Sequence, residues 1–272
     1  MGFKKHPLFL LSSLFFSLII NAQVSICSWN IMNLGKSKSD VELEFIAKTI
    51  NNYDIITIQE VVAGNGGAKA VIRLVSILNN KGAKWDYAIS DVTTSDNPSS
   101  RERYAFIWKP SKVTKIGDSW LEQNFQREID REPFMSTFGY KGSRFTIASF
   151  HAVPKKKNPE KEIKYFKYLP SLYPKLNIIF MGDFNCSQSN TVFNPLKNNG
   201  YKSLLTNQKT SLRQKCLKQD CLASEYDNMF YYSKKVTVEK AGVENFYTQF
   251  VTLKEARKIS DHIPIYGIVL IK

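Results

Sequence analysis

The chain has 272 residues, of which 43% are hydrophobic and 13% aromatic, a composition that excludes an intrinsically disordered protein and allows one large domain with its own core. Its 38 Lys and Arg residues outnumber its 24 Asp and Glu residues, so the formal net charge is +14 at pH 7. This excess favours a polyanionic partner, such as nucleic acid, an anionic membrane or a phosphorylated polysaccharide, and plain solubility is the alternative explanation.

The first 22 residues have the layout of a secretory signal. Lys4 and Lys5 precede an apolar stretch over residues 8–20, and Ala22 offers a small residue for cleavage. The stretch is short for a transmembrane helix, although Ile20 stands where a small residue is usual, so an uncleaved membrane anchor is the alternative. We therefore expect a secreted or periplasmic protein whose single domain spans residues 23–272.

Short apolar runs alternate with helical patterns along this domain. A buried strand is expected over residues 24–29, and then a helix that Ser39 and Glu42 open with a capping box. A second strand over residues 54–60 leads through a Gly-rich loop into a helix over residues 68–80. Further strands are expected at 87–91, 104–108, 144–150, 177–181, 226–231 and 266–271, and a charged helix at 160–172.

No internal repeat, linker or low-complexity tract separates the two halves of this pattern. The alternation therefore predicts an α/β fold in which two packed sheets carry helices on their outer faces.

Several of the predicted strands deliver a polar or acidic residue at their end. These residues are Asn30, Glu60, His151, Asp183 with Asn185, and Asp261 with His262. Strand ends on one edge of a sheet can converge on one site, and carboxylate and amide oxygens suit Mg²⁺ or Mn²⁺. Any one of them could be a cap or turn residue, but together they predict metal-assisted hydrolysis of a phosphate ester.

Histidine is scarce in this chain. Of its three histidines, His6 lies in the expected signal, whereas His151 and His262 each follow or adjoin an apolar run. Imidazole can accept or donate a proton near neutral pH, so the pair predicts acid–base chemistry, with a purely structural role as the alternative for either residue alone.

The four cysteines lack the paired CxxC spacing of a zinc site. Cys27 lies in the first strand and is expected to be a small buried residue. In an oxidising compartment, one disulfide is expected among Cys186, Cys216 and Cys221, and the residues alone leave the pairing open.

In this order, the motifs resemble the endonuclease/exonuclease/phosphatase superfamily and, within it, the deoxyribonuclease I branch. The Gln-Glu, Gly-Asp-Phe-Asn and Ser-Asp-His motifs are specific to the superfamily, and the Glu-Arg-Tyr, Arg-Glu-Pro and Tyr-Asp segments point to the branch. The resemblance covers all of residues 23–272 through Trp29-Asn30, Ile58-Gln59-Glu60-Val61, Arg101-Glu102-Arg103-Tyr104, Arg131-Glu132-Pro133-Phe134, Ser149-Phe150-His151, Met181-Gly182-Asp183-Phe184-Asn185, Tyr226-Asp227 and Ser260-Asp261-His262. It implies a four-layer α/β sandwich of two packed mixed sheets flanked by helices.

The resemblance also implies a role for each motif residue. Glu60 would hold the divalent metal, Mg²⁺ or Mn²⁺, with Asn30 and Asp261 beside it. His262, oriented by Asp227, would take a proton from the attacking water, and His151, oriented by Glu102, would protonate the leaving oxygen. Which histidine is the acid and which the base is left open. Asp183 and Asn185 would position the phosphoryl group, and the substrate would contact Arg131, Asn30 and Arg101.

The chain departs from the family pattern at several positions. No arginine follows Glu60 to enter the minor groove, and Ser100 stands in place of the groove-stacking tyrosine. We therefore expect Arg101 and Lys69 to compensate through phosphate contacts. The small disulfide loop of the family is absent, its structural Ca²⁺ sites have no support here, and its larger disulfide implies that Cys186 pairs with Cys216 or Cys221.

The function implied is that of a secreted, monomeric, metal-dependent endonuclease that cuts DNA with little sequence specificity. The alternative within the superfamily is a secreted phosphodiesterase or phosphatase acting on sphingomyelin or inositol phosphates. A scaffold that only binds polyanions is a third possibility, but every acidic motif residue and both histidines are present.

Overall fold

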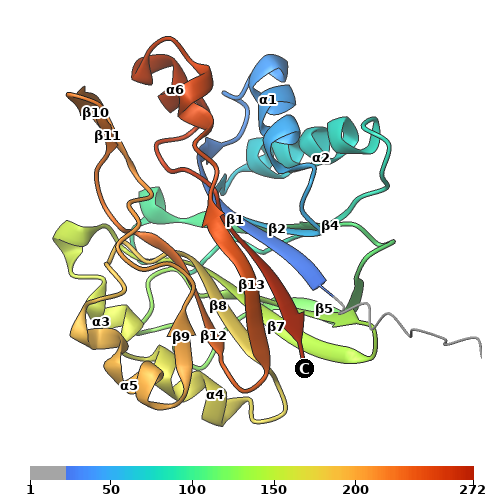
Figure 1. Cartoon of the computed structure of the whole chain (residues 1–272), viewed down its shortest axis with the longest axis vertical. Helices are drawn as coiled ribbons and strands as arrows, with labels where there is room; N and C mark the ends of the chain where they lie inside the picture. Colours follow the sequence, from blue (N-terminus) through green and yellow to red (C-terminus); the bar gives the residue numbers. More distant parts are fainter. Residues whose placement is uncertain (1–22) are drawn as a thin grey trace, which may run out of the picture.

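The computed structural model describes residues 23–272, which form two six-stranded mixed sheets and a separate two-stranded hairpin (Figure 1). The predicted signal, residues 1–22, lies outside the described part. In spatial order the first sheet contains β13 (Val236–Val243), β14 (Ile265–Ile271), β1 (Gln23–Leu34), β2 (Ile55–Val62), β4 (Glu102–Trp108) and β3 (Asp86–Ile89). The second contains β5 (Thr114–Leu121), β6 (Phe134–Tyr140), β7 (Ser143–His151), β8 (Ile178–Asp183), β12 (Asp227–Tyr232) and β9 (Tyr201–Ser203). The hairpin is β10 (Leu212–Leu217) with β11 (Asp220–Leu222).

The two sheets pack face to face through an apolar layer. Phe106 of the first sheet lies 5.8 Å, ring centre to ring centre, from Phe138 of the second, and Ile147, Met181 and Val269 belong to the same buried cluster. Burial of side chains from both inner faces is the main force that holds such a sandwich together.

Helices cover the two outer faces and complete the predicted four-layer sandwich, which is confirmed. The outer face of the first sheet packs against α1 (Asp40–Ile50), α2 (Asn65–Asn79) and α6 (Leu253–Ile259). The outer face of the second packs against α3 (Glu160–Ile163), α4 (Leu169–Leu172) and α5 (Asn194–Asn198). The 3₁₀ turns are η1 (Pro98–Ser100), η2 (Lys155–Lys157), η3 (Phe166–Tyr168), η4 (Thr191–Phe193) and η5 (Phe246–Gln249).

The start of each long helix follows from its local sequence. The predicted capping box of α1 is confirmed, since Ser39 accepts from the amide of Glu42 and the Glu42 carboxylate accepts in return. Helix α2 begins three residues earlier than predicted and includes Gly67, where a Cβ would lie 2.0 Å from the carbonyl oxygen of Val62. Only glycine lets this helix approach the end of β2 so closely.

The single helix predicted over residues 160–172 is wrong. The segment forms α3, then η3, then α4, and Pro170 lies in the first turn of α4. Proline has no amide hydrogen with which to continue the helical hydrogen bonds of η3, so a separate turn begins there.

The register of the strands brings the polar strand ends together on one rim. Strands β7 and β8 are parallel, and His151 pairs with Asp183, which also pairs with Asp227 on β12. In the first sheet β1 and β2 are parallel, so Asn30 and Glu60 end at the same edge. The carboxyl ends of parallel strands, supplemented by the start of an antiparallel one, thus form the site.

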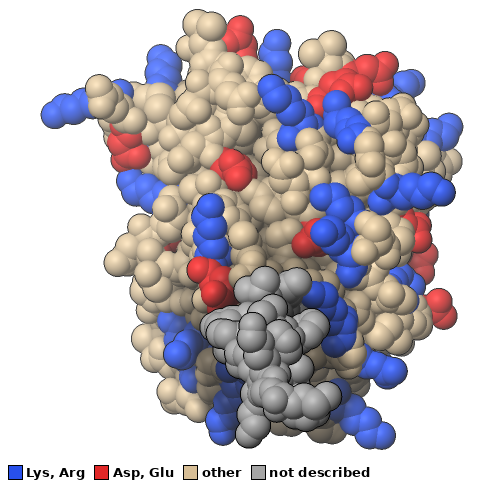
Figure 2. Space-filling model, turned by 45° about the vertical axis from the view of Figure 1, so that its right-hand side comes forward, with Lys and Arg blue, Asp and Glu red and all other residues tan. Residues whose placement is uncertain are grey.

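Lys and Arg side chains are spread over the face shown in Figure 2, with Asp and Glu side chains between them. Within residues 23–272, none of the helices combines the length and apolar character needed to cross a membrane.

Candidate active site

His151 is held by a buried carboxylate. Its Nδ1 lies 2.9 and 3.0 Å from the two oxygens of Glu102, which starts β4 in the opposite sheet. Arg131 donates from Nη1 to the same carboxylate at 3.1 Å, and the hydroxyl of Tyr104 accepts from the His151 amide. These contacts fix the ring so that Nε2 faces the rim.

His262 is held in the same way by a second carboxylate. Its Nδ1 lies 2.7 Å from Oδ2 of Asp227. The indole Nε1 of Trp29 donates to the His262 carbonyl at 2.7 Å, and the Ser260 hydroxyl accepts from the His262 amide at 3.1 Å. Each histidine therefore has its own orienting carboxylate.

Asp183 lies between the two histidines. Its Oδ2 is 3.4 Å from Nε2 of His151 and 3.5 Å from Nε2 of His262, so both rings present Nε2 to one oxygen. Asn30 donates from Nδ2 to this oxygen at 3.1 Å, and the Asn185 amide donates to Oδ1 at 2.9 Å. The arrangement offers two proton-transferring nitrogens around a single anionic position.

Glu60 stands at the more open side of the same cluster. Its Oε1 accepts from Asn30 Nδ2 at 3.0 Å and lies 4.0 Å from His151 Nε2, and its Oε2 accepts from the Asn33 amide at 3.1 Å. Its side chain is 25% exposed. The φ angle of Glu60 is +60°, a left-handed conformation that is costly for a non-glycine residue and that concentrates at functional sites.

The charges in the cluster shift one another's pKa values. Burial and Arg131 act to lower the pKa of His151, but Glu102 and Asp183 outweigh them and raise it. Burial would raise the pKa of Glu102, but the charges of His151 and Arg131 prevail and lower it. In the first dyad the imidazolium form of His151 and the carboxylate form of Glu102 therefore stabilise each other.

The second dyad and the shared carboxylate behave as one coupled group. Burial would lower the pKa of His262, but Asp227 and Asp183 hold that pKa well above its usual value. Burial raises the pKa of Asp227 to about 6. Burial would also raise the pKa of Asp183, yet the two histidines prevail and lower it. Groups shifted this far in one cluster are typical of a site of proton transfer.

The donor set fits a hard divalent cation. The Asn30 Oδ1 atom is buried and has no hydrogen-bond partner among the described residues, and the carboxylate of Glu60 is next to it. Asp183, Asp227 and His262 form a buried group whose ligand atoms lie within 4.8 Å of one another. An unpartnered buried oxygen beside carboxylates suits Mg²⁺ or Mn²⁺.

The residues of this site come from most of the length of the chain, and one family model matches nearly the same range. The model of the Endonuclease/Exonuclease/phosphatase family matches residues 27–262. The chain belongs to this family. Among curated proteins it is 25% identical to a deoxyribonuclease of Thioalkalivibrio sp. over 90% of this chain and 70% of that one. It is 26% identical to human deoxyribonuclease gamma over 88% and 84% of the two chains.

Solved structures of the Endonuclease/Exonuclease/phosphatase fold align over nearly the whole chain. The catalytic domain of human Nocturnin aligns with a TM-score of 0.62 and 15% identity over 93% of this chain and 96% of that one. A family member from Bacteroides vulgatus aligns with a TM-score of 0.64 and 14% identity over 92% and 99%. At these identities the alignments establish the fold.

Three further predicted residues lie at or near the rim in different settings. The Asp261 carboxylate is 3.2 Å from Arg257 and is partly exposed. Arg131 is buried, with its guanidinium directed at Glu102 and at the Ala152 carbonyl, so in this structure it supports a dyad rather than facing solvent. Arg101 is exposed, and its Nε donates to the Ser95 carbonyl at 2.8 Å.

The residues that fix the histidine backbones were not predicted as site residues; they are Trp29, Tyr104 and Ser260. All three lie inside the family motifs, and that position is the sequence signal that could identify them. Tyr226 was not predicted either; its ring stacks near that of His262 with centroids 6.4 Å apart.

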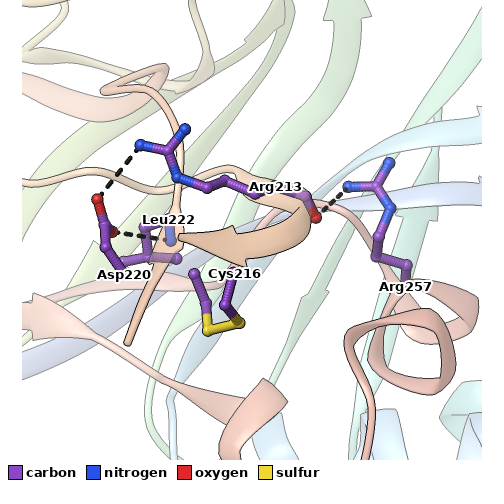
Figure 3. The surroundings of a disulfide bond; sticks show 6 residues. Arg213, Cys216, Asp220, Leu222 and Arg257 are labelled. Atoms are coloured by element: carbon purple, nitrogen blue, oxygen red, sulfur yellow. Dashed lines mark hydrogen bonds and ion pairs between the residues drawn. A yellow bond between two sulfur atoms is a disulfide. The ribbon is translucent and has the colours of Figure 1, made fainter. Parts of the chain in front are cut away.

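The disulfide implied for Cys186 is wrong. Cys216 and Cys221 pair with each other across the β10–β11 turn (Figure 3), and Cys186 is a buried thiol in the core beneath the second sheet. Two cysteines five positions apart on one hairpin can pair without any long-range closure. Cys27 is a buried thiol, as predicted.

Proposed function

We propose that the protein is a divalent-metal-dependent endonuclease that hydrolyses DNA phosphodiester bonds with little sequence specificity. The observation that carries this proposal is the pair of buried histidines, each with its own carboxylate, whose Nε2 atoms both face Asp183. The relatives named deoxyribonucleases support DNA as the substrate.

In the proposed reaction the histidines act on opposite sides of the phosphorus. His262 accepts the proton of the attacking water at Nε2, and Asp227 holds the ring through Nδ1 and stabilises the positive charge that forms on it. His151 gives the proton of its Nε2 to the leaving oxygen, and Glu102 holds the ring and stabilises its charge. Each carboxylate fixes the protonated nitrogen as Nδ1, so that Nε2 is the atom that reacts.

The remaining residues position the phosphoryl group and the metal. Asn30 and Asn185 place amide groups beside Asp183, where the phosphate oxygens would lie. Glu60, with Asn30 and Asp261 beside it, would hold Mg²⁺ or Mn²⁺. When bound, the cation supplies charge neutralisation at the phosphate.

We further propose that the protein is exported and acts as a monomer. Support comes from the signal-like layout of residues 1–22 and from a disulfide of the kind that persists in oxidising compartments. Expression in a bacterial host, followed by N-terminal sequencing of the protein recovered outside the cytoplasm, should give a chain that starts near Gln23. A cytoplasmic chain that retains Met1 would contradict export.

The decisive experiment offers the protein several phosphate esters, each in its own reaction. Supercoiled plasmid, RNA, sphingomyelin and phosphoinositides are incubated separately with Mg²⁺, with Mn²⁺ and with EDTA. We expect nicked and then linear plasmid with either metal and intact plasmid in EDTA. Turnover of sphingomyelin or phosphoinositides together with an untouched plasmid would instead establish the lipid or inositol-phosphate alternative.

A further inference from the structure

The β10–β11 hairpin is a basic projection that the proposed reaction does not use. It extends away from both large sheets beside α6 (Figure 1). Lys209, Arg213, Lys215 and Lys218 lie in or next to it, against the single carboxylate of Asp220. We refer to residues 209–222 as the basic hairpin.

The base of the basic hairpin is bonded directly to the catalytic segments. The Leu212 amide donates to the Asp261 carbonyl at 2.7 Å, and Ser211 forms an isolated β-bridge with His262. The Asp227 amide donates to the Thr210 hydroxyl at 2.9 Å. The hairpin therefore starts at the His262–Asp227 dyad and has a fixed direction relative to it.

Some of the positive side chains of the basic hairpin form ion pairs within it, and others form none. Asp220 accepts from Lys209 at 2.7 Å and from Arg213 at 3.2 Å, and the disulfide closes the turn (Figure 3). Lys215 and Lys218 are exposed and form no ion pair with any of the described residues. The two free cations thus lie toward the tip, on a braced strand pair.

A groove of about 580 Å³ separates β10 from α6, and its charged walls are all positive. Gln214 and Lys215 of β10 line one side, and Thr252, Leu253, Lys254 and Arg257 at α6 line the other. No acidic side chain is among its lining residues. Positive side chains next to uncharged polar and aliphatic ones match the phosphates and sugars of a nucleic-acid backbone.

We propose that the basic hairpin and this groove bind the DNA backbone next to the cleaved phosphate, on the His262 side; this rests on the proposed endonuclease function. The six residues from Leu212 to Leu217 span about 20 Å as a strand. At about 3.4 Å per base pair, the contact extends the binding site by roughly six base pairs. This contact should increase the affinity for DNA without any preference for base sequence, because it is made to phosphates.

A membrane is the less suitable partner for the same surface. Leu217, 62% exposed, is the one large hydrophobic side chain exposed on the basic hairpin. A membrane-inserting hairpin would present several large apolar or aromatic side chains at its tip.

The test compares two triple variants of equal charge loss. The first is Lys215→Gln with Lys218→Asn and Lys254→Gln; asparagine is chosen because φ is +57° at Lys218. The matched control is Lys175→Gln with Lys235→Gln and Lys272→Gln, three lysines around a hollow at the opposite end of the second sheet. Equal melting temperatures establish that both variants are folded.

Binding is measured in a His151→Ala background with a fluorescent 24-base-pair duplex at several salt concentrations. We expect the hairpin variant to bind on the order of 10–100-fold more weakly at low salt, and its log K against log salt slope to be shallower by about 2–3. The control should bind like the parent. Plasmid cleavage is measured with variants that keep His151, and only the hairpin variant should show a higher KM.

The outcomes separate this proposal from the function on which it rests. If the wild type cuts plasmid but the two triple variants have equal affinity and slope, the hairpin proposal is wrong and the endonuclease function stands. If the wild type leaves plasmid intact with Mg²⁺, both are wrong. Loss of binding to phosphatidylserine vesicles by the hairpin variant, with duplex binding unchanged, would identify a membrane surface and overturn the DNA contact.

Discussion

His151 and His262 are the residues on which the proposed chemistry depends most directly, because each Nε2 faces the same Asp183 oxygen. Proton transfer by a positioned side chain is worth ~10²–10⁴ in rate, so His151→Ala and His262→Ala should each lower kcat by that factor. The double variant should lose far less than the product of the two losses, since the residues act as one unit. Plasmid nicking rates and thermal melts measure both.

A purely structural role for the histidines makes the opposite prediction. Either alanine variant would then melt at a lower temperature but keep its activity in the folded fraction. A single variant that melts like the wild type and cuts at a comparable rate would remove that histidine from the mechanism.

Arg131 is expected to stabilise the fold through Glu102. Removing one partner of a buried ion pair leaves the other uncompensated, so Arg131→Ala should lower the free energy of unfolding by roughly 3–5 kcal/mol at neutral pH. Because the pKa of Glu102 is lowered in the folded state, its stabilising contribution is present at neutral pH and is lost as the pH falls through that value.

The difference between Arg131→Ala and the wild type should therefore shrink on acidification, which urea unfolding at two pH values would measure. Full stability of Arg131→Ala together with weaker DNA binding would instead favour the direct phosphate contact predicted from the sequence.

The two thiols should be unreactive in the folded protein. Cys27 and Cys186 are buried, and burial raises the pKa of Cys186 to about 11, so little thiolate is present near neutral pH. Titration with a thiol reagent should find no fast-reacting group in the native protein and two after denaturation without reductant. A single thiol, or four, after denaturation would contradict the Cys216–Cys221 pairing.

At the scale of elements, Gly182 sets the distance between β7 and β8. Its φ is +139°, and a Cβ there would lie 2.0 Å from the Phe150 carbonyl oxygen. Gly182→Ala should therefore force apart the strands that carry His151 and Asp183, lowering both melting temperature and activity. Gly142→Ala is the control, since its φ of +86° gives backbone strain alone, with no atom within 4 Å of the added Cβ. If Gly182→Ala is no less stable than the control, β7 and β8 can accommodate the added Cβ and the prediction is wrong.

The elements that the sequence predicts well are the buried ones. Strands β1, β2, β7 and β8 carry continuous apolar runs because both of their faces are covered. Strands β5, β6, β9, β10, β11 and β13 were not predicted. Both β5 and β13 lie at a sheet edge and are largely half-buried or exposed, so their sequences lack such a run. Strand β6 is an exception, because it is a largely buried inner strand whose apolar residues are interrupted by Ser136 and Thr137.

The candidate site, like the fold, could be predicted only in part from the sequence. Local sequence identifies polar residues at strand ends, and the family resemblance pairs each histidine with a carboxylate. Neither indicates that Asp183 lies between the two Nε2 atoms, or that Arg131 faces inward, because those placements depend on how two separate sheets pack. The family resemblance implies a disulfide to Cys186, but Cys216 and Cys221 lie on one hairpin and pair with each other.

At the scale of the whole molecule, the net charge of +14 and the absence of groove-reading side chains give a joint prediction. Ser100 lies in η1, and the residues after Glu60 lead through Gly64 into α2 without an arginine. Cleavage should therefore depend steeply on salt and only weakly on minor-groove width. Cleavage maps of A-tract and mixed-sequence duplexes at several salt concentrations measure both. Rates that follow groove width closely would contradict this.

Strand β1 has a consequence for how the protein is made. It lies in the middle of the first sheet, where Gln23 to Ser28 pair with Leu270 to Ile265 of β14, more than two hundred residues later. During synthesis β1 is made long before its partner strand β14, so the two can pair only after β14 has been made. The hydrogen bond from Trp29 to the His262 carbonyl can form only at the same late stage. A ribosome-bound or prematurely terminated chain thus lacks both a closed sheet and a catalytic centre. We therefore expect the proposed hydrolytic activity to appear only when translation is essentially finished, so that incomplete chains should be inactive on nucleic acid.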